Sequence, residues 1–412
     1  MTKLSPEGNE IVFSTYLGGS GLDLGYGVAS NGNAVFVTGA TTSSDFPVKN
    51  PLQQTSGGGQ DAFITKIDFT GSTLLYSTYF GGDGEDVGNG ISVDAGNNVY
   101  IVGDTGSTNL PLMNPIQASF GGVVDGFVAK LATSISEQIS LVYSTYLGGG
   151  GGDFGNDIVI DSNGNAYIAG ATNSVNFPLV NPVQPAFGGG MDGFVAKLNA
   201  SGSAFVFSTY LGGSGIEYAH GVAIDVPRNV YVAGETSSQN LPLVKPYQSD
   251  LRGVTDAFVM KLNSAGNTML YSTYLGGADD DRAFAVAATD AGDAFVTGET
   301  FSTNFPTTST GIQTATGGAS DAFVSRLHVA VPTITAIEVK KKKLFVHGEN
   351  FEEGAMIGVG GVLQKTKNDG DDPTTLLIAK KGAKNIKRGV PVGIHVENPD
   401  GIRSEQISYI KP

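Results

Sequence analysis

The chain has 412 residues and a formal net charge of −15, with 60 glycines, 40% hydrophobic residues and no cysteine. The missing thiols exclude disulfides, thiolate metal sites and cysteine nucleophiles. The acidic charge is concentrated in residues 1–331, which contain 29 acidic and 11 basic residues. A domain this acidic repels phosphate backbones and anionic lipid, so we expect no nucleic acid partner and no binding to a membrane surface.

The N-terminal segment Thr2–Gly8 resembles the interior of a repeat rather than a signal peptide. We therefore expect that an export signal preceded it, and we leave open whether further chain did. Apolar runs throughout the chain are shorter than the roughly 18 residues that a membrane-spanning helix needs, so membrane insertion is not expected. Abundant Val, Thr, Tyr, Phe, Gly and Asn indicate strands and turns with almost no long helix.

A repeated motif organises most of the sequence. The pattern Ser-Thr-Tyr-(Leu/Phe)-Gly-Gly recurs at intervals of 63, 67, 64 and 64 residues, beginning at Ser14, Ser77, Ser144, Ser208 and Ser272. Two short strands separated by a turn follow each copy, as in Gly90–Asp94 and Val99–Gly103. A long loop then leads to a third strand, Asp-(Ala/Gly)-Phe-(Ile/Val)-x-(Lys/Arg)-(Ile/Leu). These strands open at Asp61, Asp125, Asp192, Asp256 and Asp321.

Four short strands per repeat predict the blade of a β-propeller. The last unit has a third strand at Asp321–Leu327 but no fourth, whereas the N-terminal segment Glu10–Leu17 has a fourth-strand motif. Joining these two segments would complete five blades and hide the open sheet edges. We therefore predict an all-β chain with a five-bladed β-propeller over residues 1–330, in which the N-terminal strand closes the last blade.

The Ser-Thr-Tyr-Leu-Gly-Gly, Gly-Asn-x-Tyr-x-x-Gly and Asp-Ala-Phe-Val-x-Lys-Leu motifs resemble the bacterial β-propeller repeat family known as SBBP, over residues 3–328. The resemblance implies an extracellular or cell-surface protein and brings no catalytic residues with it. The count of five departs from the seven blades that the family name anticipates.

Residues 331–412 form a second predicted domain. Short alternating runs such as Leu344–His347 and Val392–Val396 indicate a β-sandwich. The segments Pro332–Ile334, Val346–Phe351 and Ile357–Gly361 resemble the IPT/TIG immunoglobulin-like family, which by analogy acts as a spacer or adhesion unit. We interpret the four lysines Lys340–Lys343 as a solvated hairpin tip rather than a nucleic acid site.

An acidic residue follows each Gly-Gly at an equivalent position: Asp23, Asp86, Asp153, Glu217 and Asp281. In a closed propeller these carboxylates would ring one mouth of the channel, where oxygen ligands without cysteine favour a hard cation such as Ca²⁺. The alternative is that each acid accepts backbone N–H bonds and fixes its turn. We favour the structural role for these acids, and still more for the Asp residues that open the third strands.

Three residues further on, the residue type varies between repeats: Tyr26, Asn89, Asn156, His220 and Phe284. Variable residues on a repeated frame are candidates for ligand binding, with packing between blades as the alternative. The loop glutamines are expected to satisfy backbone groups, and they are Gln53, Gln117, Gln184, Gln248 and Gln313. The tyrosines of the Ser-Thr-Tyr motif are expected to pack within the blades.

Three functions remain open at this stage. The first is a non-catalytic binding or scaffold protein that presents a propeller face to a polysaccharide, protein or matrix partner. The second is a glycosidase or lyase that uses the channel-mouth carboxylates, with Glu217 and His220 as the first residues to test. The third is an inert structural spacer. Identical acids in every repeat favour the first, because glycoside hydrolysis needs two carboxylates in different environments.

Overall fold

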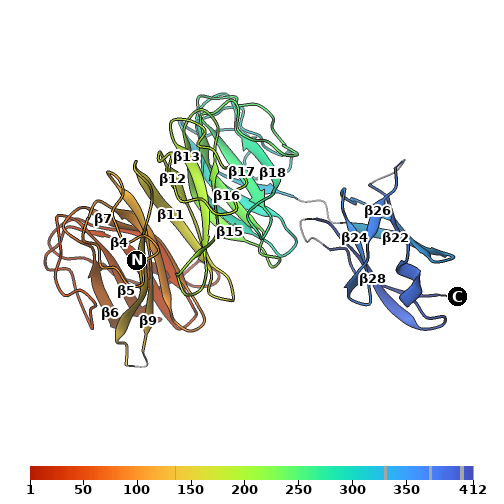
Figure 1. The fold of residues 1–412 in the computed structure, drawn as a ribbon. Coiled ribbons are helices and arrows are strands. Elements are labelled where there is room, and N and C mark those ends of the chain that lie inside the picture. Colours follow the sequence, from red (N-terminus) through yellow and green to blue (C-terminus); the bar gives the residue numbers. More distant parts are fainter. Residues whose placement is uncertain (135, 329–331, 371–373, 400–402, 412) are drawn as a thin grey trace. The chain divides into compact units, whose positions relative to one another are not determined.

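The computed structural model describes residues 1–134, 136–328, 332–370, 374–399 and 403–411 (Figure 1). It separates into two compact units. The first contains Met1–Ile224, Val230–Ala287 and Val296–Ser325, and the second contains Asp225–Asn229, Ala288–Phe295 and Arg326–Pro412. The predicted domain boundary between residues 330 and 331 falls outside the described residues.

Four repeats form four-stranded antiparallel sheets whose strand order follows the chain. The first sheet contains β3 (Asp23–Ser30), β4 (Ala34–Thr41), β5 (Asp61–Asp68) and β6 (Leu74–Phe80). The second contains β7 (Asp86–Val93), β8 (Val99–Thr105), β9 (Asp125–Thr133) and β10 (Ile139–Leu147). The third contains β11 (Asp153–Ile160), β12 (Ala166–Thr172), β13 (Asp192–Leu198) and β14 (Phe205–Leu211). The fourth contains β15 (Glu217–Ile224), β16 (Val230–Thr236), β17 (Asp256–Leu262) and β18 (Met269–Leu275). The predicted four-strand repeat is thus confirmed for these units.

A fifth sheet has only three strands, in the order β19 (Asp281–Ala288), β20 (Ala294–Thr300) and β21 (Asp321–Leu327). The prediction that the N-terminal strand joins this sheet is wrong for the described structure. Strand β2 (Ile11–Ser14) pairs instead with β1 (Thr2–Leu4) in a separate two-stranded sheet.

The reason lies in the first residues of the chain, which carry the end of a third-strand motif. Thr2, Lys3 and Leu4 pair with Ser14, Phe13 and Ile11, with a register shift before Leu4. Strands β13 and β14 pair in the same register, from Ala196 opposite Ser208 to Leu198 opposite Phe205, with a shift at the same place. Strand β1 therefore occupies the edge of β2 that β21 would need.

Neighbouring sheets share apolar cores. Phe36 and Tyr76 of the first sheet pack in one cluster with Phe127 and Tyr146 of the second. A second cluster joins the second and third sheets, and a third joins the third and fourth. The motif tyrosines from Tyr79 to Tyr274 are buried, as predicted, but Tyr16 is fully exposed. Face-to-face packing of consecutive sheets is consistent with propeller repeats.

The second unit contains two further antiparallel sheets. One has the order β22 (Thr333–Lys340), β23 (Lys343–Glu349), β27 (Leu376–Ala379) and β26 (Thr366–Asn368). The other has the order β25 (Val362–Leu363), β24 (Met356–Val359), β28 (Pro391–Glu397) and β29 (Ile407–Ile410). Side chains from both sheets, among them Val346, Leu377, Ile357 and Val396, share one core. Lys340–Lys343 is an exposed hairpin tip, as predicted.

The 3₁₀-helix η1 (Gly382–Asn385) is the one helix among the described residues. Within that part of the chain, no helix has the length and apolar character needed to cross a membrane.

Candidate functional site

The first strand of each four-stranded sheet contains a bulge, and the variable residue of that repeat lies in it. The register shifts between Gly25 and Gly27 in β3, around Tyr26, and at the same place in β7, β11 and β15, around Asn89, Asn156 and His220. A glycine on the second strand permits this geometry: a Cβ at Gly103 would lie 1.8 Å from the Val87 carbonyl oxygen. Because a bulge redirects the side chain of the extra residue, the repeat places one variable side chain per sheet at an equivalent point.

Two of the five predicted binding residues connect neighbouring sheets. The Asn89 amide donates to the Asp104 carboxylate at 2.9 Å and to the Gly155 carbonyl of the next sheet at 3.0 Å. The Asn156 amide donates to the Ala219 carbonyl of the following sheet at 2.9 Å. Both asparagines therefore serve the packing between repeats, which was the alternative interpretation. Tyr26 and Phe284 are 54% and 48% exposed.

His220 is the centre of a mixed cluster that the repeat does not reproduce elsewhere in the described chain. We define the His220 cluster as Tyr218, His220, Glu235, Arg282 and Phe284. The Nε2 atom of His220 lies 3.3 Å from Glu235 Oε1, and Arg282 Nε lies 2.9 Å from Glu235 Oε2. The His220 ring stacks on Tyr218 at 5.8 Å and meets the edge of Phe284 at 5.7 Å. The cluster thus joins β15, β16 and β19 through charged and aromatic groups.

The cluster is accessible to solvent in part. The side chains of His220, Glu235 and Arg282 are 25%, 18% and 37% exposed. Partly desolvated charges interact more strongly than charges in bulk water, and an exposed guanidinium can still donate to a ligand. This site can therefore offer fixed hydrogen-bonding groups beside aromatic surfaces.

Each of the five acids predicted to ring the channel mouth is bonded within its own turn. Each accepts a backbone N–H from the glycine four residues earlier, at 2.6–2.8 Å: Asp23 from Gly19, Asp86 from Gly82, Asp153 from Gly149, Glu217 from Gly213 and Asp281 from Gly277. Hydroxyl groups add to this, as when Ser107 donates to Asp86 at 2.8 Å. Among the described residues, no three His, Cys, Asp or Glu side chains gather as metal ligands. In this arrangement the acids fix turns, which is the structural role that the sequence favoured.

We refer to these five acids as the inner acids. Four of them also lie beside the Asp that opens the third strand of the preceding sheet: Asp86, Asp153, Glu217 and Asp281. A Cβ at Gly81 would lie 2.1 Å from Asp61 Oδ1 and 2.6 Å from Asp86 Oδ2. Burial, with a smaller contribution from the nearby negative charge, raises the pKa of Asp86. For the same two reasons, the pKa values of Asp125 and Asp192 rise to about 6.

The loop glutamines satisfy backbone groups, as expected. Gln53 Oε1 accepts the Gly81 N–H at 3.1 Å, and Gln117, Gln184 and Gln248 accept the equivalent N–H groups at 3.0 Å. Their amide nitrogens donate back to the loop, for example from Gln117 to Ser119.

Sequence reasoning missed three acids that differ from the repeat pattern. Asp104 Oδ1 accepts the Gly155 N–H at 2.8 Å, and Asp157 Oδ2 accepts the Val222 N–H at 2.9 Å, so both bind the next sheet. Burial raises the pKa of Asp104 to about 6 and also raises that of Asp157. Glu235 is the third. A position-by-position comparison of the repeats could have found Asp104 and Glu235. Both stand at the same position of the second strand, which alanine occupies in β4 and β12.

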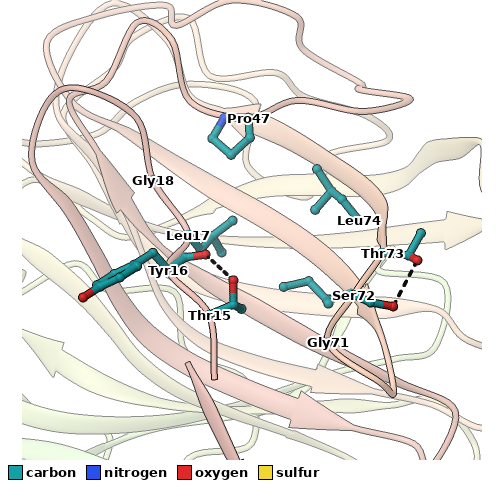
Figure 2. Close-up of a pocket in the computed structure, with 10 residues that line it drawn as sticks. Thr15, Tyr16, Leu17, Gly18, Pro47, Gly71, Ser72, Thr73 and Leu74 are labelled. Carbon is teal, nitrogen blue, oxygen red and sulfur yellow. Dashed lines mark hydrogen bonds between the residues drawn. The ribbon is translucent and has the colours of Figure 1, made fainter. Parts of the chain in front are cut away.

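A hollow of about 260 Å³ lies between the N-terminal segment and the first sheet (Figure 2). Thr15–Gly18 line one part of it, and Pro47, Ile67 and Gly71–Leu74 line the rest. The Tyr16 ring points away from the other labelled residues. No lining residue is charged, so the polar groups that the hollow offers are hydroxyl and backbone groups.

Comparison with known proteins gives one informative result. No curated protein matches the chain. Among solved structures, the chain is similar to a fungal alcohol oxidase of the AA5 family in complex with copper, at 9% identity and a TM-score of 0.34. That match covers 95% of this chain and 85% of the oxidase, and it is too weak to assign a fold or an activity. The family model SBBP, described as a beta-propeller repeat, matches residues 75–111, 142–178 and 206–242, so the chain contains SBBP beta-propeller repeats in three places.

Proposed function

We propose that this chain is a non-catalytic binding and scaffold protein of the cell surface or extracellular space, and that the His220 cluster binds a polysaccharide. The observation that carries the proposal is a polar and aromatic cluster that the other repeats, as far as the structure describes them, do not share. Binding residues concentrate where a rigid scaffold presents variable side chains.

The chemistry of the cluster suits a sugar chain. Aromatic rings such as Tyr218 can pack against the apolar face of a sugar, while His220 and Arg282 can donate to its hydroxyl groups. Glu235 holds both of these polar side chains in place, which reduces the entropy lost on binding.

The carboxylates support binding rather than hydrolysis. Glycoside hydrolysis uses two carboxyl groups with separate roles. Glu217 accepts N–H and O–H bonds from Gly213 and Thr236 within its own repeat, and Glu235 is engaged by His220 and Arg282. Glu235 is the carboxylate within the His220 cluster, and the adjoining Asp280 is also engaged, with its Oδ2 atom 3.8 Å from Arg282 Nη2.

The finer architecture belongs to the same proposal. The five sheets would act as blades of a propeller-type scaffold, and the second unit would be an IPT/TIG-like spacer or adhesion module of a bacterial surface protein. Support comes from the regular repeats, from the SBBP matches and from the shared core of the two sheets in the second unit.

Isothermal titration against a panel of soluble polysaccharides tests the binding function. We expect at least one polysaccharide to bind, with affinity at least tenfold weaker in His220→Ala and Arg282→Ala. Arg252→Ala is the matched control, because this arginine lies in the loop between β16 and β17 and donates to the Gly276 carbonyl rather than to a residue of the cluster. The affinity of this variant should not change. Melting temperatures of all variants establish that they fold. Failure of the whole panel to bind, or equal binding by all variants, contradicts the proposal, and release of reducing ends would indicate an enzyme instead.

A further inference from the structure

The junctions between neighbouring sheets use one repeated backbone bond. The N–H of each inner acid donates to the carbonyl just before the third-strand Asp of the preceding sheet, at 2.8–2.9 Å: Asp86 to Gln60, Asp153 to Val124, Glu217 to Met191 and Asp281 to Thr255. Every sheet therefore offers an N–H to the sheet before it and a carbonyl to the sheet after it. At the two ends of the array, the equivalent groups are the Asp23 N–H and the Ser320 carbonyl.

Side-chain groups at the two ends of the array are complementary in the same way as these backbone groups. Tyr146 donates its hydroxyl to the Ser107 carbonyl at 2.8 Å and accepts the Leu110 N–H at 3.2 Å. Tyr16 has the same motif position but is fully exposed, and the matching backbone groups, at Ser302 and Phe305, lie in the fifth repeat. The glutamine bond follows the same pattern. Gln313 in the fifth repeat is equivalent to Gln53, which accepts the Gly81 N–H, and Gly18 is equivalent to Gly81.

The strands at these ends are uncovered where their counterparts are buried. Val324 in β21 is 78% exposed, whereas Val128, Val195 and Val259 at the same position are 0% exposed. Strand β2 nevertheless lies as a fourth strand does. Phe13 contacts the turn at Gly71, as Tyr143 contacts Gly202 and Phe207 contacts Gly266. Strand β2 thus takes the place of a fourth strand in front of the first sheet, while Tyr16, at the end of its motif, stays exposed.

We propose that copies of this chain associate head to tail, with residues Tyr16–Asp23 of one copy docking on Gln313–Val324 of another. The occupant is a second copy because this chain itself carries the complementary groups, while Tyr16 at one end and Val324 at the other are exposed where their counterparts in the internal sheets are buried. Within one chain, β2 pairs with β1, which has only three residues. Strand β21 of another copy has seven residues, so it offers β2 a longer set of backbone hydrogen bonds. A heterologous contact of this kind generates rings or filaments.

Cysteine cross-linking tests the contact in a chain that has no other cysteine. The internal pairs Gln60–Glu85, Val124–Gly152 and Met191–Ile216 form parallel bridges, and Ser320 and Leu22 occupy the equivalent positions. Strands paired in this way bring Cα atoms to roughly 5 Å, within disulfide range. A mixture of Leu22→Cys and Ser320→Cys chains should form a covalent dimer on mild oxidation. Leu22→Cys mixed with Val175→Cys, exposed on a loop elsewhere, should not.

The double variant Leu22→Cys/Ser320→Cys distinguishes association between copies from closure of one chain on itself. A ladder of covalent multimers is expected, and an internally cross-linked monomer would overturn the proposal because it would mean that one chain closes on itself.

Sedimentation tests the association without cross-linking. The mass of the unmodified chain should rise with its concentration. Tyr16→Ala should weaken this association at least tenfold, while Val175→Ala leaves it unchanged. A monomer at all concentrations contradicts the proposal without bearing on polysaccharide binding.

Discussion

The internal sheets and the two ends of the repeat array carry the same motifs in different surroundings. Tyr79, Tyr146, Tyr210 and Tyr274 are buried in the array, whereas Tyr16 in the same motif is exposed. Strands β13 and β17 are buried along their length, but β21 has one buried residue. The motif therefore determines which groups can form hydrogen bonds. Those groups are buried, and their bonds contribute to stability, only where a neighbouring sheet covers them.

Truncating the motif tyrosine should give the largest contrast. Tyr146→Ala removes a buried ring and leaves the Leu110 N–H and Ser107 carbonyl unpaired. We expect a loss of about 3–5 kcal/mol in the free energy of unfolding. Tyr16→Ala should change it by less than about 0.5 kcal/mol in dilute solution, because the ring is exposed. Urea unfolding followed by fluorescence measures both, and equal losses would contradict the comparison.

A smaller contrast is expected on the third strand. Val259→Ala removes two buried methyl groups and should cost about 2 kcal/mol. Val324→Ala alters an exposed side chain at the equivalent position and should be close to neutral. Thermal unfolding of the two variants, measured at low protein concentration, provides the test. A marked loss in Val324→Ala would mean that β21 is covered in solution.

The smallest effect concerns pH. Asp192 has a pKa raised to about 6 by burial, with a contribution from Glu217, against roughly 3.9 in an unfolded chain. The folded state therefore binds this proton more tightly. The stability that the proton contributes is fully present below about pH 4 and is lost as the pH rises through 6.

Replacing the Asp192 carboxylate should make the melting temperature depend less on pH. Asp192→Asn is expected to reduce the fall in melting temperature between pH 4 and 7. Asp321→Asn, at the same motif position in the less buried β21, is the matched control and should leave the profile close to that of the unmodified chain. An unchanged slope in Asp192→Asn would show that this carboxyl does not titrate in the interval.

Local chemistry made much of the fold predictable. The third strands begin at the predicted Asp residues, and the loop glutamines and inner acids satisfy turns, because these bonds join residues within one repeat. Closure of the last blade was not predictable. The decisive segment, Thr2–Leu4, is too short to give a strand signal, yet it takes the edge of β2.

The candidate site was predictable only in part. The varied position that includes His220 marks the bulge in each first strand, because that position changes while the frame does not. Its partners Glu235 and Arg282 come from the second strand of the same sheet and from the next repeat. Contacts between separate strands leave no periodic signal in a single sequence, so the cluster emerged only with the structure.

The parallel bridges between sheets have a mechanical consequence. A single bridge such as Gln60–Glu85 joins the backbones of two repeats at that point, in place of a continuous ladder. Tension applied along the chain would load these joints one after another. Repeats of about 64 residues would then be released singly, each adding roughly 220 Å of chain length. A chain pulled at its two ends would therefore lengthen stepwise before it breaks.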